Sequence, residues 1–354
     1  MIKESILKII DGQDLDRIEA ENVMNEIMSG KLTGAQIAAV LTSLRMKGES
    51  VDEITSFVSV MKKHCHEINP KISGPLVDTC GTGGDKIKTF NVSTIAAFVA
   101  AGSGISIAKH GNRSVTSRCG SADVLEALGF NLKMPPEKVE KSIEKHGIGF
   151  MFAPSFHPAM KYAIGPRREI GIRTIFNVLG PLSNPANAKV QLVGVYEGKL
   201  TEKLAQVLSN LDVNKAMVVH GIDGLDEIST IGKTKISLLN DGKISTSYIA
   251  PKDIGVNMSR IEDLAGSNPE ESALTTFKIL NDFKNHKSKR NPKKDIVLVN
   301  AAATIFLGGK ADSIKEGLEV ARVSIQSGSA YEKLRSLIKF SDGEISKLEE
   351  MENA

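Results

Sequence analysis

The sequence predicts an α/β fold that carries a small all-α domain, with a mostly parallel central sheet flanked by helices. Two observations predict it: helical periodicity dominates the first 70 or so residues, and short β-rich runs alternate with glycines and helical segments from Leu76 onward. The chain has 354 residues, of which 41% are hydrophobic and 25% are charged. This composition excludes disordered and fibrous proteins, and the length suits one large domain or two unequal ones.

The N-terminal part is predicted to be helical because apolar residues return at helical spacing. Two helix starts are marked by capping boxes, Thr33 with Gln36 and Ser50 with Glu53. The helical pattern ends near Asn69-Pro70. We therefore expect a helical domain over residues 1–72 and an α/β domain over residues 73–354.

The strands of the α/β domain are predicted from short runs of β-branched and other apolar residues. The candidate strands are 76–78, 105–108, 190–195, 216–219 and 296–299, and 236–249 is predicted to be a hairpin that turns at Asn240-Asp241-Gly242. The segment 311–354 is predicted to be helical.

Charge and targeting signals narrow the class of protein. The chain has 45 Lys and Arg against 42 Asp and Glu, a net charge of +3, which argues against a wholly basic nucleic-acid-binding surface. The basic stretch Lys284 to Lys294 is interpreted as a solvated loop, since only Phe283 could supply an aromatic contact to nucleic acid. There is no signal peptide, no membrane-length apolar run and no Cys-x-x-Cys pair. We expect a cytoplasmic protein with neither a membrane nor a nucleic-acid partner.

A glycine-rich turn follows the first predicted strand, in Asp78-Thr79-Cys80-Gly81-Thr82-Gly83-Gly84-Asp85. Glycines let backbone N–H groups wrap an anion, because no Cβ blocks the approach and positive φ costs little. The turn is neither a Walker loop nor the dinucleotide fingerprint. A tight strand-to-helix turn would also explain these glycines.

Further polar groups follow the turn. Asn91-Val92-Ser93-Thr94 lies at a predicted helix N-terminus, a second anion cradle, so the two cradles suit a diphosphate. The strand 105–108 leads into Lys109-His110-Gly111-Asn112-Arg113, at the edge of the sheet where ligands bind, and a phosphate would pair its cations. His110 suits a general base or a hydrogen-bonded structural residue. Asp226-Glu227 would suit Mg²⁺ or, as the alternative, a solvated surface.

Taken together, these motifs resemble the anthranilate phosphoribosyltransferase family. The resemblance extends through Gly-Ser-Ala-Asp-Val-Leu-Glu-Ala-Leu-Gly from Gly120, Phe-His-Pro-Ala-Met from Phe156, Arg-Arg-Glu-Ile-Gly-Ile-Arg-Thr from Arg167 and Gly-Leu-Asp-Glu from Gly224, and it covers essentially the whole chain. It implies a fold like that of nucleoside phosphorylases and this class of phosphoribosyltransferases, in which about 165–182 joins the helical domain. It also implies transfer of a 5-phosphoribosyl group from phosphoribosyl diphosphate to anthranilate in tryptophan biosynthesis, Mg²⁺ as cofactor, and a homodimer formed through the helical domain.

The resemblance also implies roles for individual residues. Those that would bind phosphoribosyl diphosphate are Gly81, Gly84, Asp85, Thr89, Asn91, Ser93, Thr94, Lys109, Asn112, Arg113, Ser117 and Ser121. Those that would line the anthranilate site are Gly81, His110, Asn112, His157 and Arg167. Ser93, Asp226 and Glu227 would bind magnesium, and Lys109, Asn112 and Arg167 would be catalytic. Cys119 stands where the family often has serine, so a phosphate contact through its side chain is not expected.

Two alternatives belong to other classes. The related pyrimidine nucleoside phosphorylases share the architecture and a glycine-rich phosphate loop, but Asp226-Glu227 and Arg167 favour a metal-bound diphosphate and a carboxylate acceptor. A non-catalytic nucleic-acid-binding relative would depend on the Lys284 to Lys294 stretch alone. For the transferase we expect mainly electrostatic catalysis and no single essential general base.

Overall fold

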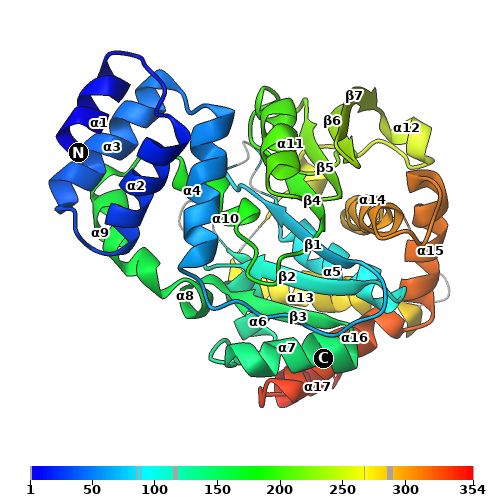
Figure 1. Ribbon diagram of the computed structural model, residues 1–354. Coiled ribbons are helices and arrows are strands. Elements are labelled where there is room, and N and C mark those ends of the chain that lie inside the picture. Colours follow the sequence, from blue (N-terminus) through cyan, green and yellow to red (C-terminus); the bar gives the residue numbers. More distant parts are fainter. Residues whose placement is uncertain are drawn as a thin grey trace.

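The computed structural model describes residues 2–84, 87, 89–114, 119–266, 268–284 and 290–353. Its N-terminal part is a group of helices set to one side of the sheet (Figure 1). These helices are α1 (Ile2–Ile10), α2 (Arg17–Met28), α3 (Gly34–Lys47) and α4 (Val51–Lys63). Both predicted capping boxes are confirmed, Thr33 with Gln36 at α3 and Ser50 with Glu53 at α4.

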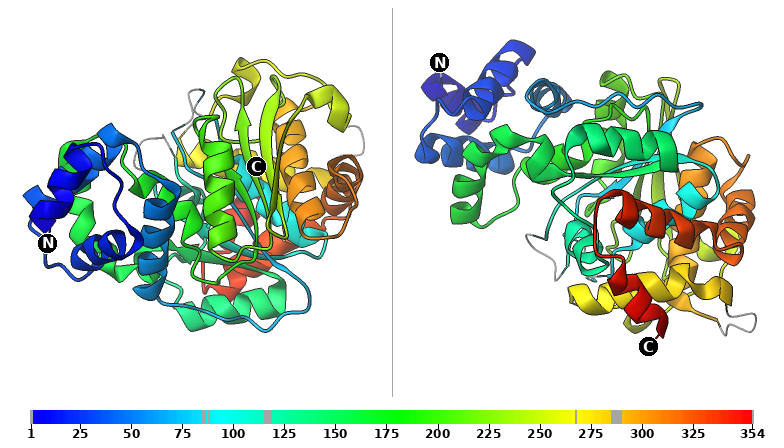
Figure 2. Two further views of the ribbon diagram at one scale, coloured as in Figure 1. Left: turned by 45° about the horizontal axis from the view of Figure 1, so that its top comes forward. Right: turned by 90° about the horizontal axis from the view of Figure 1, so that it is seen from below.

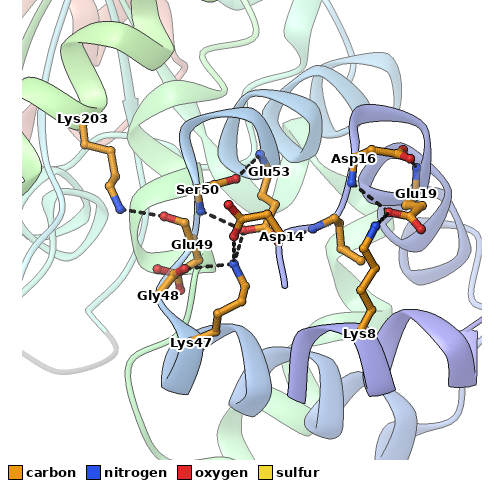
Figure 3. A network of polar contacts seen from close by, with 11 residues as sticks. Lys8, Asp14, Asp16, Glu19, Lys47, Gly48, Glu49, Ser50, Glu53 and Lys203 are labelled. Atoms are coloured by element: carbon orange, nitrogen blue, oxygen red, sulfur yellow. Dashed lines mark hydrogen bonds and ion pairs between the residues drawn. The ribbon is translucent and has the colours of Figure 1, made fainter. Parts of the chain in front are cut away.

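A buried carboxylate holds this helical group together (Figure 3). Glu53 is fully buried and accepts hydrogen bonds from the backbone N–H of Leu15 at 3.0 Å, from that of Ser50 at 2.8 Å and from Lys47 Nζ at 2.9 Å. Lys203 donates to the carbonyl of Glu49 at 2.6 Å. The start of α4 is therefore tied both to the α1–α2 connection and to a helix that packs on the sheet.

Seven strands form one sheet in the order β3-β2-β1-β4-β5-β6-β7. Neighbours from β3 to β5 are parallel, whereas β6 and β7 add an antiparallel hairpin. The strands are β1 (Leu76–Gly81), β2 (Ser106–Gly111), β3 (Ile148–Phe152), β4 (Val190–Gly194), β5 (Lys215–Gly221), β6 (Thr234–Asn240) and β7 (Lys243–Ile249). Four of the five separately predicted strands and the hairpin are confirmed, and β1 and β2 run further than predicted.

One predicted strand is wrong and one strand was not predicted. Residues 296–299 lie inside α14 (Pro292–Leu307), where they are buried. A short apolar run fits a buried strand or a helix buried on all sides equally well, and only the packing decides between them. β3 was not predicted because Gly149 and the short length of the strand hide its pattern.

Helices cover both faces of the sheet (Figures 1 and 2). The remaining α-helices are α5 (Val92–Gly102), α6 (Ser121–Ala127), α7 (Pro136–His146), α8 (Ala153–Phe156), α9 (Lys161–Ile170), α10 (Phe176–Leu182), α11 (Leu200–Asn210), α12 (Pro251–Ile254), α13 (Pro269–Leu280), α15 (Ile314–Gln326), α16 (Ser329–Phe340) and α17 (Ser346–Asn353). Single 3₁₀ turns lie at Pro158–Met160, Glu262–Leu264 and Asp282–Lys284. The predicted helical C-terminal segment is confirmed, with Ser313 as the cap of α15.

Alternate strand residues feed two hydrophobic cores. Val77, Leu192 and Val219 belong to the core that α5 and α14 cover, whereas Val193 and Val218 face the core shared with α4 and α11. Because successive side chains of a strand point to opposite faces, β4 and β5 each contribute to both cores. None of the helices described is long and apolar enough to cross a membrane.

The sheet order places a crevice beside β1 and β4. These strands are neighbours, and the chain proceeds from β1 toward β3 on one side and from β4 toward β7 on the other. Ligands of such sheets bind outside the carboxyl ends of the strands at this switch point. α9 packs against α2 and α3, and α10 packs against α4 (Figure 1), so the chain returns to the helical group close to this edge.

Candidate active site

A cavity of about 450 Å³ opens at the carboxyl ends of β1 and β2. Every described residue that the sequence assigned to a site lines it: Gly81, Gly84, Thr89, Asn91, Ser93, Thr94, Lys109, His110, Asn112, Arg113, Ser121, His157, Arg167, Asp226 and Glu227. Asp85 and Ser117 lie outside the described residues. We call the wall around 81–84, 93, 109, 226 and 227 the turn side, and the wall around 110, 157, 167 and 176 the histidine side.

On the turn side, the glycine-rich segment leaves β1 in a conformation that favours glycine. Gly83 and Gly84 have φ values of +67° and +81°. Thr82 is tied to the neighbouring strand, because its N–H donates to the carbonyl of Gly194 at 2.9 Å and its Oγ1 accepts from the N–H of Tyr196 at 3.2 Å. The turn is therefore held at the end of β1 by contacts with Gly194 and Tyr196.

Asp226 reaches this turn over the ends of β1 and β4. The N–H of Gly83 donates to Asp226 Oδ2 at 2.8 Å. A Cβ at Gly81 would lie 2.5 Å from that oxygen, and a Cβ at Gly194 would overlap the carbonyl of Asp226. The glycines that end both strands thus make room for a carboxylate at the site.

Glu227, Ser93 and Lys109 form the rest of the turn side. The N–H of Ser93 donates to Glu227 Oε1 at 3.2 Å, and Lys109 Nζ donates to Ser93 Oγ at 3.2 Å and to the carbonyl of Thr79 at 2.6 Å. Lys109 is buried, and this burial lowers the pKa of its ammonium. The carboxyl that most favours the charged form of Lys109 is Asp78, whose own pKa is raised by burial to about 6.

The carboxylates fit a magnesium ion that is shared with a phosphate ligand. Asp226 and Glu227 are both buried, and Glu227 accepts a hydrogen bond from the backbone N–H of Ser93. Within the ranges that the structure describes, no group of three or more His, Cys, Asp or Glu side chains could hold a metal ion. Mg²⁺ commonly takes one or two carboxylates and completes its shell with water and substrate phosphates. The donor set therefore suits that mode of binding and not an all-protein cage.

On the histidine side, two imidazoles face each other. The ring centroids of His110 and His157 are 5.0 Å apart, and His110 Nδ1 lies 3.2 Å from the carbonyl of Gly180. Burial lowers the pKa of His110 to about 3 and that of His157 to about 4. Both Nε2 atoms are buried and have no hydrogen-bond partner among the described residues. Neutral rings this weakly basic argue against the general-base interpretation of His110.

Arg167 completes the histidine side from α9. Its guanidinium lies 5.0 Å from the ring centroid of Phe176, and burial lowers its pKa. No carboxylate pairs with it in the described part of the chain. A half-buried guanidinium without a counter-charge suits an anionic ligand, and its planar fork matches a carboxylate.

Comparisons with known proteins agree on one family. Residues 73–331 match the model of the glycosyl transferase family a/b domain, and residues 3–65 match that of the helical bundle domain. The chain is 51% identical over 343 residues to an anthranilate phosphoribosyltransferase of Methanocorpusculum labreanum, covering 97% of this chain and 99% of the relative. It is 47% identical over 346 residues to one of Acetivibrio thermocellus, covering 98% of each.

The chain belongs to the anthranilate phosphoribosyltransferase family. Among solved structures, the anthranilate phosphoribosyltransferase of Thermus thermophilus superposes with a TM-score of 0.88 at 37% identity, covering 95% of this chain and 99% of that one. The Saccharomyces cerevisiae enzyme, solved in complex with PRPP and Mg, has a TM-score of 0.88 at 28% identity, covering 96% and 98%. The predicted family, fold class and transferase class are confirmed, and neither alternative class is favoured.

Within the anthranilate phosphoribosyltransferase signature, Arg113 is oriented differently from the expectation. Its guanidinium donates to Asp123 Oδ1 at 3.0 Å and to Glu126 Oε2 at 2.7 Å on α6, which raises its pKa. The side chain is 46% exposed. Arg113 lines the cavity, but in this structure its guanidinium forms ion pairs with Asp123 and Glu126 of α6.

Position 119, where this chain departs from the family, contributes through its backbone. The amide nitrogen of Asn91 donates to the carbonyl of Cys119 at 3.3 Å. This bond uses the backbone carbonyl and does not depend on the side chain at position 119.

Sequence reasoning missed three residues beside the site. Phe176 lies under Arg167, while Tyr196 and Arg173 hold the glycine turn from behind. Arg173 and Phe176 lie within the motif Gly-Ile-Arg-Thr-Ile-Phe-Asn, which gives no contact by itself, and Tyr196 lies outside the motifs.

Proposed function

We propose that this chain transfers the 5-phosphoribosyl group of phosphoribosyl diphosphate to the amine of anthranilate and releases diphosphate. One observation carries the proposal. A single cavity joins an anion-binding turn with a buried lysine and two carboxylates on one side to a half-buried arginine on the other. The two sides match a diphosphate and a benzoate carboxylate, respectively.

The turn side would hold phosphoribosyl diphosphate. The buried Asn91 Oδ1 and Thr94 Oγ1 lack hydrogen-bond partners among the described residues. Asn91 Oδ1 would accept from a ribose hydroxyl, and the hydroxyl of Thr94 would donate to a phosphate. The ammonium of Lys109 would contact the diphosphate, and Thr89 and Ser121 also line this part of the cavity. Asp85 and Ser117 stay predictions from the family motif.

Ser93, Asp226 and Glu227 would hold Mg²⁺, directly or through water. When bound, the ion would offset negative charge that develops on the departing diphosphate. The Gly83 amide, which donates to Asp226, would keep that carboxylate in place.

The histidine side would hold anthranilate. Arg167 would take the carboxylate in its planar fork, with Gly81 and Asn112 at the boundary between the two substrates. Because the Gly180 carbonyl can only accept, Nδ1 of the neutral His110 ring carries the proton and donates to it. Nε2 is then left to accept from the anthranilate amine. His157 would contribute a second neutral acceptor.

The chemistry would be mainly electrostatic. Positive charge develops on the ribosyl carbon and negative charge on the leaving group, so Lys109 would stabilise the transition state on the side of the leaving group. The attacking amine is neutral before bond formation, and the lowered pKa values of both histidines leave no strong base beside it. Orientation of the amine and exclusion of water would supply the rest.

The helical group, residues 1–72 together with about 165–182, would form one domain and carry a homodimer interface. Large apolar side chains on α1, α2 and α3 support the interface, because they are at least 60% exposed: Leu7, Ile10, Ile18 and Met46. Light scattering should give twice the mass of the chain. A monomer at micromolar concentration would contradict the proposed dimer.

One assay tests the activity. Anthranilate fluorescence should fall only when enzyme, phosphoribosyl diphosphate and Mg²⁺ are all present. Phosphate-dependent release of thymine from thymidine, with no loss of anthranilate, would instead establish a nucleoside phosphorylase.

A further inference from the structure

Arg173 contacts the glycine turn without lining the cavity. It lies in the connection between α9 and α10, and its Nη2 donates to the carbonyl of Gly84. Its guanidinium also stands 4.6 Å from the ring centroid of Tyr196. The side chain is therefore held on two sides, by a backbone carbonyl and by an aromatic face.

Within the described residues, the contacts that hold Thr82 and Gly83 come from the α/β part of the chain. Gly194 and Tyr196 hold Thr82, and Asp226 holds the amide of Gly83. Arg173 instead comes from the segment that leaves α9, the helix that packs against α2 and α3. It thus links the last described residue of the turn to the helical group.

Position 84 is shaped for this contact. Gly84 has a φ of +81°, and a Cβ built there would collide with the guanidinium of Arg173. The left-handed backbone favours glycine at this position, and the absence of a Cβ leaves room for the guanidinium of Arg173.

We infer that Arg173 is a positioning residue that fixes the glycine turn for the diphosphate of the substrate. Arg167 lies six positions earlier on the same segment. One stretch of chain therefore supplies both the arginine proposed to bind the acceptor and the arginine that contacts the turn. This inference deepens the proposed function and rests on it.

The test compares Arg173→Ala and Arg173→Lys with Arg168→Ala, a control that removes an exposed arginine of α9. For Arg173→Ala we expect the KM for phosphoribosyl diphosphate to rise at least tenfold, while the KM for anthranilate stays within twofold. Arg173→Lys keeps the charge but not the planar fork, so a rise of about threefold is expected. Arg168→Ala should leave both constants within twofold.

Calorimetry with phosphoribosyl diphosphate and Mg²⁺, without anthranilate, gives a readout separate from turnover. The Kd should rise by the same factor as the KM, and Arg173→Lys decides the matter if Arg173→Ala does not fold. Unchanged Kd and KM in the Arg173 variants, or equal changes in the KM of both substrates, would overturn the inference. Wild-type protein that binds the diphosphate sugar but consumes no anthranilate would refute the proposed function and leave this comparison intact.

Discussion

The turn side of the cavity is built from a glycine-rich backbone turn and ionisable side chains, whereas the histidine side is built from uncharged rings and one arginine. On the turn side, glycines at 81 and 194 admit the carboxylate of Asp226, and Lys109 lies buried within hydrogen-bond reach of Ser93. On the histidine side, burial keeps His110 and His157 neutral. The difference indicates that binding of a charged leaving group depends on backbone conformation and ionisable groups. The specificity for the acceptor depends on the side chains of the histidine side.

The largest loss of activity from a change on the turn side is expected for Asp226→Ala. Loss of this carboxylate removes the acceptor of the Gly83 amide and one proposed magnesium ligand, so we expect kcat/KM to fall about 100-fold or more, or about 2.7 kcal/mol. Steady-state anthranilate fluorescence measures it. Asp241→Asn, in the β6–β7 turn, is the matched control, and a loss below tenfold for Asp226→Ala would contradict the prediction.

The histidine side should respond to Arg167→Ala in a different constant. A charge-assisted contact to a carboxylate contributes about 2 kcal/mol, so we expect the KM for anthranilate to rise about 30-fold. The KM for phosphoribosyl diphosphate should stay within threefold, and Arg168→Ala serves again as control. Parallel rises in both constants would mean that the two sides are not independent.

The neutrality of the histidines predicts a pH dependence of stability. Their folded pKa values, about 3 and about 4, lie below the ordinary value of 6.5, so the unfolded chain binds more protons below about pH 6.5. The free energy of unfolding therefore falls as the pH drops, on the order of 1.4 kcal/mol per unit for each histidine. Asp78 acts in the opposite direction, because its pKa is raised to about 6 and the folded state takes up its proton first.

A comparison of wild type with His157→Asn isolates one of these groups. Between pH 7.5 and pH 5.5, the variant should lose about 1.4 kcal/mol less of its free energy of unfolding than wild type does. Urea denaturation at both pH values measures it, and the contribution of Asp78 cancels. Equal losses in the two proteins would show that His157 is not held neutral.

The smallest effect is expected from Arg113→Ala. Its ion pairs with Asp123 and Glu126 are largely exposed, so the free energy of unfolding should fall by less than about 1 kcal/mol. The KM for phosphoribosyl diphosphate sharpens the comparison. A tenfold rise in this KM would show that Arg113 contacts the bound substrate. An unchanged KM would show that Arg113 keeps its ion pairs with α6.

Local patterns were sufficient for much of the fold and the site. Capping boxes at Thr33 and Ser50 mark helix starts because their partners are three residues away in the chain. The glycine turn and Lys109 could be assigned to one cavity because both follow parallel strands, whose carboxyl ends meet at one edge. The segment 296–299 was misassigned because its short apolar run has no local feature that separates strand from buried helix.

By itself, the sequence determined the positions of four of the strands, the glycine turn, the carboxylate pair and the family, because each depends on residues that are neighbours in the chain. Only the tertiary structure decided that His110 and His157 are neutral, that Arg113 pairs with α6 and that Arg173 clamps Gly84. Burial, and contacts such as that of Arg173 with a carbonyl 89 positions away, depend on which distant segments pack together. No spacing along the chain encodes that arrangement.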